Sequence, residues 1–144
     1  MGLCFNYSSN ANLFFRLFTP ELLWTSPELL RDPETINKGT QKGDVFSFAI
    51  IMAQLIGRGP PYNMPDMTAQ QIIGKVRKPP PLCRPKISIS DVPPAYMQLI
   101  KRAWSEQPEV RPSFDELNQQ IKAANRGKDR LELYLVSFYG SVRL

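Results

Sequence analysis

Residues 44–56 read DVFSFAIIMAQLI, and ten of the twelve residues after Asp44 are apolar. One group of these side chains recurs at helical spacing, and the remaining apolar residues cover the other sides of the same helix. The first group is Val45, Phe48, Ala49, Met52 and Leu55. The pattern predicts a helix that is buried on every side and too short to cross a bilayer. We expect Asp44 to cap its start and the glycines and prolines at 57–61 to end it.

Capping signals outside this stretch predict further helices. Ser26 followed by Pro27 and Glu28 is typical of the start of a short helix. Two segments, 68–71 (TAQQ) and 113–116 (SFDE), have the form of a capping box, in which the first hydroxyl and the fourth side chain bond free amide hydrogens. The prolines lie between these helical stretches. The sequence therefore predicts a mainly α fold.

Composition limits the classes of function. The chain has 144 residues with 42% apolar content, which suits one domain. Its net charge is +5, but the basic residues are scattered, so we expect a solvated surface and no nucleic-acid partner. The sequence has no histidine, and Cys4 and Cys83 lie far apart, so we expect no metal site and no disulfide framework. This cysteine usage favours a reducing, cytoplasmic setting.

One aromatic residue stands out in the helical stretch near residues 94–104. Trp104 continues the helical spacing of Tyr96, Met97 and Ile100, so we predict that it anchors the core. A role for Trp104 in recognition is the alternative.

Three segments together resemble the C-terminal lobe of a protein kinase. Residues 25–28 (TSPE) resemble the Ala-Pro-Glu motif, with Ser26 in place of alanine. Residues 42–49 (KGDVFSFA) resemble the start of the buried central helix of that lobe. Residues 104–114 (WSEQPEVRPSF) resemble the segment whose arginine pairs with the Ala-Pro-Glu glutamate. The resemblance implies an incomplete kinase-like fold made of the helical lobe.

The same resemblance implies roles for three charged residues. Glu28 and Arg111, 83 positions apart, are expected to form a two-pronged ion pair that ties the first helix to the last. Asp44 corresponds to the residue that anchors the kinase catalytic loop, so it is left without its usual partner. With Trp104, these are the candidate site residues, and their expected role is structural. No catalytic, cofactor-binding or metal-binding residue is predicted.

The loops narrow the resemblance further. Residues 42–44 (KGD), 58–62 (RGPPY) and 76–85 (VRKPPPLCRP) are similar to the kinase-homology domain of the receptor guanylyl cyclases, which make cyclic GMP. In that family this domain is a pseudokinase that binds ATP or regulates, and a separate cyclase domain performs the chemistry. We therefore divide the chain into an unassigned segment at 1–21, a partial kinase-like domain at 22–125 and a divergent tail at 126–144.

The motifs of a working kinase are missing from the sequence. His-Arg-Asp requires histidine, and neither Asp-Phe-Gly nor Gly-x-Gly-x-x-Gly occurs. No cyclase metal-site carboxylates follow residue 125. We expect no cofactor in this chain, since ATP and magnesium belong to the complete family domain, and we expect the chain to be a partial product of a longer gene.

The leading hypothesis is a non-catalytic, regulatory kinase-homology fragment of a receptor guanylyl cyclase. Its expected partners are regulatory proteins or the parent receptor dimer, with no membrane span in this chain. The expected location is the cytoplasm, on the cytoplasmic side of a plasma-membrane parent. Two alternatives stay open. The chain could be the lower lobe of an active tyrosine-kinase-like enzyme, or a stand-alone interaction module that competes with the parent receptor.

Overall fold

The structure of the chain is a computed structural model that describes residues 20–32, 35–36, 38–88 and 92–126. The described part contains helices and loops and no strand, which confirms the predicted mainly α fold. In chain order the elements are η1 (Pro20–Trp24), α2 (Pro27–Arg31), α3 (Gln41–Gly57), α4 (Ala69–Arg77), α5 (Pro94–Ala103), η3 (Pro108–Val110) and α6 (Phe114–Asn125).

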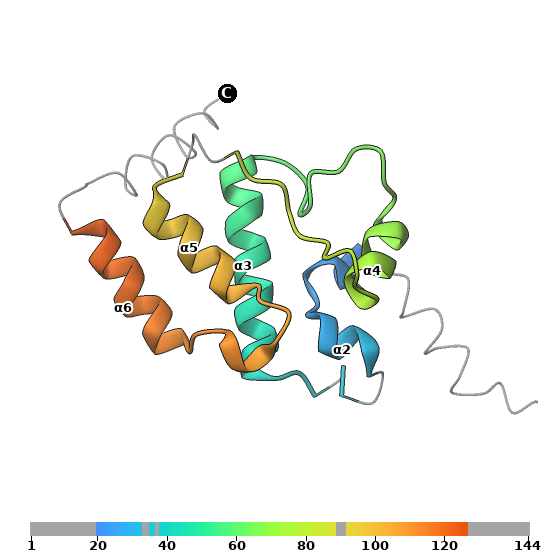
Figure 1. Ribbon diagram of the computed structural model, residues 1–144, viewed down its shortest axis with the longest axis horizontal. Coiled ribbons are helices and arrows are strands. Elements are labelled where there is room, and N and C mark those ends of the chain that lie inside the picture. The colour runs from blue at the N-terminus through green and yellow to red at the C-terminus, as the bar shows by residue number, and fades with distance from the viewer. Residues whose placement is uncertain (1–19, 33–34, 37, 89–91, 127–144) are drawn as a thin grey trace, which may run out of the picture.

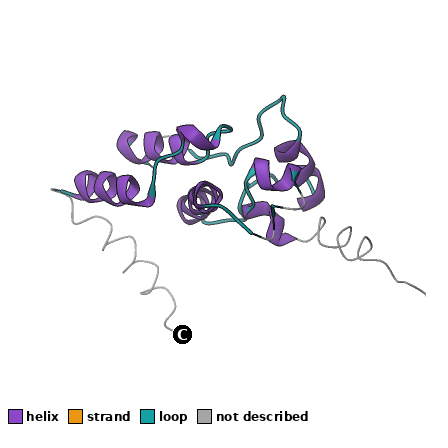
Figure 2. Cartoon of the chain, turned by 90° about the horizontal axis from the view of Figure 1, so that it is seen from below, coloured by secondary structure: helices purple, strands orange, loops and turns teal. Residues whose placement is uncertain are grey.

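Helix α3 forms the centre of the molecule. It packs against α5 on one side and η1 on another, and its start lies beside η3. Viewed from below in Figure 2, α3 is nearly end-on, with the α5 and α6 helices on one side and the η1, α2 and α4 group on the other. Figure 1 shows α5 running antiparallel between α3 and α6. The predicted central position of this helix is therefore confirmed.

The core is built on the first half of α3. Its most deeply buried residues are Val45, Phe46, Ala49 and Ile50, each at most 1% exposed. Side chains from α2, α4, α5 and α6 surround them, including Leu30, Ile72, Ile73, Val76, Leu99, Ile100, Ala103 and Leu117. Burial of these side chains removes apolar area from water at every helix contact, which is the main source of stability for the packed lobe.

The start of α3 differs from the prediction. The helix begins at Gln41, and the cap is Thr40, whose hydroxyl accepts the backbone N–H of Gly43 at 2.9 Å. Asp44 lies inside the first turn, and its side chain is exposed. The prediction that Asp44 is the N-cap is therefore wrong. Threonine is itself a good capping residue, and Thr40 directly precedes the first helical residue, so its hydroxyl reaches the free N–H of the first turn.

The second half of α3 is also less buried than predicted. Ile51 is 44% exposed and Leu55 is 59% exposed, so the prediction of burial on every side is wrong. Ala53, between them in the sequence, is buried on the side where the other helices pack. The apolar composition of α3 would allow burial on every side, but the neighbouring helices in the described residues cover only part of its circumference.

Both predicted capping boxes are present. Thr68 and Gln71 cap α4 reciprocally, and Ser113 and Glu116 do the same for α6. Ser26 stands at the N-cap position of α2 as predicted, but its hydroxyl makes no capping bond. These local signals mark the starts of α2, α4 and α6, and α2 carries Glu28 and Arg31 of the charged cluster described next.

Candidate functional site

The candidate site is centred on Arg111, which lies between η3 and α6. Pro108 and Pro112 restrict the backbone on either side of it. The Arg111 side chain is 0% exposed. A guanidinium cannot lose its charge in a protein, so burial is tolerated only when partners replace the lost water.

All five N–H donors of Arg111 have partners within the protein. Nη1 and Nη2 donate to the Glu28 carboxylate, with Nη1 to Oε1 at 2.6 Å and Nη2 to Oε2 at 2.8 Å. The other three bonds go to backbone carbonyls of Lys42, Ser105 and Glu106. Since a guanidinium has five donors, none is left to bind a substrate. Arg111 therefore joins α2, the start of α3 and the loop after α5.

Glu28 reaches Arg111 from the first turn of α2 and has a side chain that is 24% exposed. Burial by itself would raise the pKa of this carboxyl. The hydrogen bonds and the charge of Arg111 outweigh that effect, so the pKa of Glu28 lies below its ordinary value. The sequence predicted this pair, and the structure places the two side chains in the two-pronged geometry. Its role in stability stays a prediction, tested below.

Two further features surround Arg111. Lys42, on the first turn of α3, donates from its Nζ to the Arg111 carbonyl, while Arg111 bonds the Lys42 carbonyl in return. The guanidinium carbons of Arg111 and Arg84 lie 5.2 Å and 5.1 Å from the centre of the Phe46 ring. Both distances suit a cation–π contact, which is stronger in a buried setting.

A second ion cluster adjoins the first through Glu106. Its carboxylate accepts from Arg31 at 2.7 Å and from Arg84 at 2.9 Å. Arg84 also donates to the carbonyls of Cys83 and Trp104 at 2.7 Å each. Burial opposes the charged form of Glu106, but its bonds to Arg84 and Arg31 lower its pKa overall. Glu106 thus joins α2, through Arg31, to the loop after the three prolines at 79–81, through Arg84.

The other two candidate residues lie at different depths. Trp104 follows the last residue of α5 and is 8% exposed within the core cluster, which is the position predicted for a core anchor. Asp44 is on the surface, and among the described residues no side chain bonds its carboxylate. The structure brings Glu28, Arg111 and Trp104 into one region and leaves Asp44 outside it.

Sequence reasoning missed Arg31, Arg84, Glu106 and Lys42. Arg84 and Glu106 lie in segments that were quoted for their family resemblance, at 76–85 and 104–114, but their pairing had no local signal. An arginine flanked by Cys83 and Pro85 in a proline-rich loop was the nearest indication, because such a loop holds a long side chain in place. Contacts across 22 or 75 positions depend on packing.

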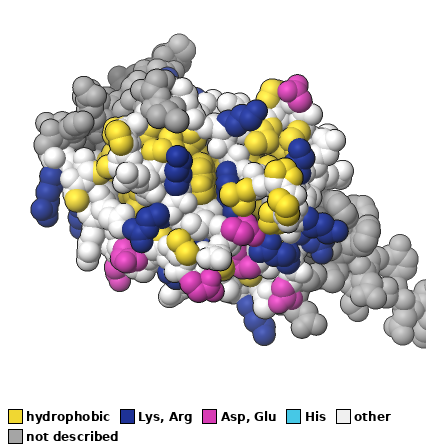
Figure 3. Space-filling view, viewed as in Figure 1, with side chains coloured by type: hydrophobic (Ala, Val, Ile, Leu, Met, Phe, Trp, Pro, Cys, Tyr) yellow, Lys and Arg dark blue, Asp and Glu magenta, His cyan; other side chains and the backbone are white. Residues whose placement is uncertain are grey.

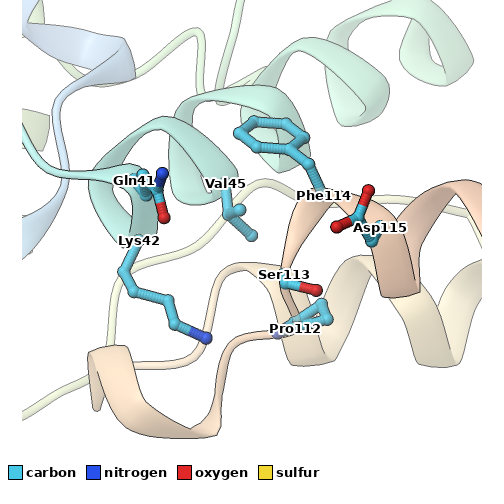
Figure 4. A pocket seen from close by; sticks show the side chains of 7 residues that line it. All are labelled: Gln41, Lys42, Val45, Pro112, Ser113, Phe114 and Asp115. Atoms are coloured by element: carbon cyan, nitrogen blue, oxygen red, sulfur yellow. The ribbon is translucent and has the colours of Figure 1, made fainter.

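The hollow beside the site is small. It measures about 140 Å³ and lies between the first turns of α3 and α6. In Figure 4, Val45 and Phe114 give it apolar walls, and Lys42 extends along one side. Pockets for small organic ligands are roughly 300–1,000 Å³. This hollow is too small for a nucleotide.

Surface charge and candidate metal ligands are two further features of the part of the chain that the structure describes. On the face in Figure 3, basic side chains are spread widely, and most of the acidic ones lie toward the lower edge among them. No group of three candidate metal ligands occurs among the described residues. Within the same residues, no helix combines the length and the apolar content needed to span a bilayer.

Comparison with known proteins supports the kinase-like helical lobe. The family model described as "Protein tyrosine and serine/threonine kinase" matches residues 18–121. The chain belongs to the protein kinase family. The predicted kinase-like helical lobe is thereby confirmed.

Individual relatives place this kinase-like chain more narrowly. It is 48% identical over 106 residues to Retinal guanylyl cyclase 1 of Bos taurus, covering 74% of this chain and 10% of that protein. It is 50% identical over 108 residues to Retinal guanylyl cyclase 2 of Homo sapiens, covering 75% and 10%. The predicted resemblance to receptor guanylyl cyclases is confirmed. The kinase-like chain spans about a tenth of the length of these relatives.

Proposed function

We propose that the chain is a non-catalytic, regulatory kinase-homology region of a receptor guanylyl cyclase in cyclic GMP signalling. One observation carries the proposal: the charged centre of the lobe is saturated by its own contacts. Arg111 uses all five donors on Glu28 and three backbone carbonyls. A centre of this kind holds helices in a fixed arrangement, which suits a unit that presents a stable contact surface to a partner.

The sequence supports the non-catalytic part of the proposal. Phosphoryl transfer requires residues that position ATP, hold magnesium and accept the substrate proton. The His-Arg-Asp, Asp-Phe-Gly and glycine-rich motifs that supply them do not occur among the 144 residues. We therefore propose that this chain transfers no phosphoryl group and holds neither ATP nor magnesium by itself.

The proposed setting follows from the relatives. A kinase-like region of a receptor guanylyl cyclase would act on the cytoplasmic side of the plasma membrane. Its partners there would be the parent receptor dimer or a regulatory protein. The rigid Glu28–Arg111 centre would keep the contact surface of the lobe in one shape while the partner binds.

Two assays of the purified chain test the non-catalytic proposal. The first follows label transfer from [γ-³²P]ATP with magnesium to a Glu-Tyr copolymer, and the second follows cyclic GMP formation from GTP. We expect no turnover above a blank in either assay. Phosphoryl transfer would overturn the proposal in favour of the active-kinase alternative, and cyclic GMP formation would overturn it as well.

Co-expression tests the regulatory part. Human Retinal guanylyl cyclase 2 is expressed with the chain, and cyclic GMP formation is measured in the membranes. We expect the chain to change this rate and Arg111→Ala to remove the change, because the variant loses the centre of the lobe. Arg31→Ala, whose ion pair is more exposed, serves as the control and is expected to keep the effect. An unchanged rate with the unaltered chain would overturn the regulatory role.

A further inference from the structure

The loop that follows α4 presents a short apolar projection to solvent. Leu82 is 58% exposed, and Pro80 and Pro81 before it are exposed as well. The next residue, Cys83, is only 7% exposed and belongs to the core cluster. The chain passes from exposure to burial within one residue, so the projection stands directly on the core.

Arg84 holds the base of this projection in place. Its Nε donates to the Trp104 carbonyl and its Nη1 to the Cys83 carbonyl, each at 2.7 Å. Its Nη2 donates to the Glu106 carboxylate at 2.9 Å, so the charge of this arginine is balanced within the lobe. A side chain on a fixed loop loses little conformational entropy when a partner binds. Leu82 is therefore a preorganised contact residue.

Basic residues surround the projection along the chain. Residues 74–86 read GKVRKPPPLCRPK, with five lysines and arginines and no acidic residue. The three lysines of this stretch are exposed, and among the described residues none of them forms an ion pair. They are Lys75, Lys78 and Lys86. Together with the projection at 80–82 they form what we call the Leu82 patch.

Contacts across the fold show that this basic character is local in space as well as in sequence. Burial raises the pKa of the Cys83 thiol, and the charges of Lys75 and Arg84 oppose that effect, which places Lys75 near the base of the projection. Arg31 of α2 reaches the same region, because its Nη1 lies 3.4 Å from the Arg77 carbonyl. Figure 3 shows apolar and basic side chains next to one another on the side of the molecule where α4 lies.

We propose that the Leu82 patch binds an acidic segment of another protein, in which an apolar side chain is flanked by aspartate and glutamate. A single exposed leucine is common on protein surfaces, and the unpaired lysines around Leu82 are what distinguish it. Carboxylates of the segment would pair with these lysines while its apolar side chain packs on Leu82 and the exposed prolines. Charge complementarity of this kind speeds encounter and rejects basic partners.

A lipid surface suits the patch less well than an acidic segment. Stable attachment to an anionic membrane combines basic charge with a large inserted apolar group, such as an acyl chain or the apolar face of a long amphipathic helix. The Leu82 patch offers one leucine and two prolines for insertion. The inference concerns binding alone and does not depend on the proposed regulatory function.

A peptide-binding assay with the full chain tests the proposal. A fluorescein-labelled peptide with glutamates on both sides of a central Leu-Phe pair is titrated with the chain at physiological salt, and binding is read by fluorescence anisotropy. We expect saturable binding that Leu82→Asp and Lys78→Glu each weaken about fivefold or more. Both side chains are exposed, so we expect the variants to keep the circular dichroism spectrum of the unaltered chain.

Matched controls carry the same charge changes outside the patch. Val110→Asp, on η3, matches Leu82→Asp because Val110 is 48% exposed. Lys101→Glu, at an exposed position of α5, matches Lys78→Glu. We expect each control to change the affinity less than about twofold, because net charge alone acts weakly through screened solvent.

Four outcomes would overturn the proposal. Absence of saturable binding is the first, and equal losses of affinity in the patch variants and their controls are the second. The third is equal binding of a peptide with glycines in place of the Leu-Phe pair, which would indicate a general affinity for anions. The fourth uses vesicles that contain phosphatidylserine. Co-sedimentation that Leu82→Asp abolishes, without binding of the peptide, would assign the patch to a membrane surface.

Discussion

The guanidinium of Arg111 and the carboxylate of Glu28 face each other across 83 positions of sequence in two parallel hydrogen bonds of 2.6 Å and 2.8 Å. The arginine side chain is fully buried, whereas the glutamate keeps 24% of its side chain in solvent. The two partners therefore differ in what their removal leaves behind. Loss of the arginine would leave a carboxylate that can partly hydrate, together with three backbone carbonyls without their donor.

We expect Arg111→Ala to cost about 3–5 kcal/mol of unfolding free energy, because it breaks a buried ion pair. The variant also removes the hydrogen-bond donors of the Glu28 carboxylate and of three backbone carbonyls. The expected cost is a large share of the roughly 5–15 kcal/mol that stabilises a typical domain. The measurement is urea unfolding followed by circular dichroism, with soluble expression as a first readout.

Arg31→Ala is the control for this prediction. Its ion pair with Glu106 is more exposed, with 40% of the arginine side chain in solvent. Exposed pairs contribute about 0–1 kcal/mol, so a small change is expected. Equal losses of unfolding free energy for the two variants would contradict the role of Arg111 in holding α2 against the rest of the lobe.

The lowered pKa of Glu28 predicts how stability depends on pH. Its carboxyl titrates near 4.5 in the unfolded chain and lower in the folded protein. The ion pair therefore stabilises the fold above about pH 4.5, and this contribution is lost as the pH falls through the lower, folded-state pKa. Glu106, whose pKa is also lowered, acts in the same direction.

Glu28→Gln separates the contribution of Glu28 from that of other carboxyl groups. We expect the variant to be less stable than the unaltered chain at pH 7 and to lose less stability on acidification. Thermal unfolding at several pH values between neutrality and acid measures both effects. Parallel stability curves for the two proteins would show that Glu28 is not the responsible group.

Gly43 and Gly74 offer a matched pair of helical glycines. A Cβ atom on Gly43 would lie 2.9 Å from Leu29 Cδ1 and 3.1 Å from Ser26 Oγ, where α3 meets α2. A Cβ on Gly74 in α4 would meet nothing within 4 Å. Gly43→Ala is therefore expected to destabilise by about 1–3 kcal/mol through overpacking. Gly74→Ala is expected to stabilise by about 0.5–1 kcal/mol, because alanine favours the helix. Thermal melting compares them, and melting shifts of the same sign would refute this reading of the α2–α3 contact.

The cap of α3 gives a prediction that distinguishes Thr40 from Asp44. Thr40→Ala removes the bond from Gly43 N–H and should cost about 1 kcal/mol. Asp44→Ala removes an exposed carboxylate in the first turn, where its effect on the helix dipole is about 0.3–1 kcal/mol. Chemical unfolding of both variants measures the difference. A larger loss for Asp44→Ala would restore that residue as the cap.

The family resemblance and the long-range pair were accessible from sequence for a particular reason. Glu28 and Arg111 each lie in a short segment with a recognisable pattern, so their partnership could be inferred without knowing the packing. Glu106 lies in the same segment as Arg111, yet its bonds to Arg31 and Arg84 carry no such pattern. The candidate site was therefore predicted at its centre and missed at its edge.

The sequence by itself determined the local structure: the two capping boxes, the helix ends at the prolines and the apolar character of α3. Each of these depends on side chains within about four positions, where hydrogen bonds form along the chain itself. Only the tertiary structure decided that Arg84 and Arg31 share Glu106, and that Ile51 and Leu55 stay exposed. Those outcomes depend on which helices lie against which faces. The type of an apolar or charged residue does not indicate which distant residue it will contact.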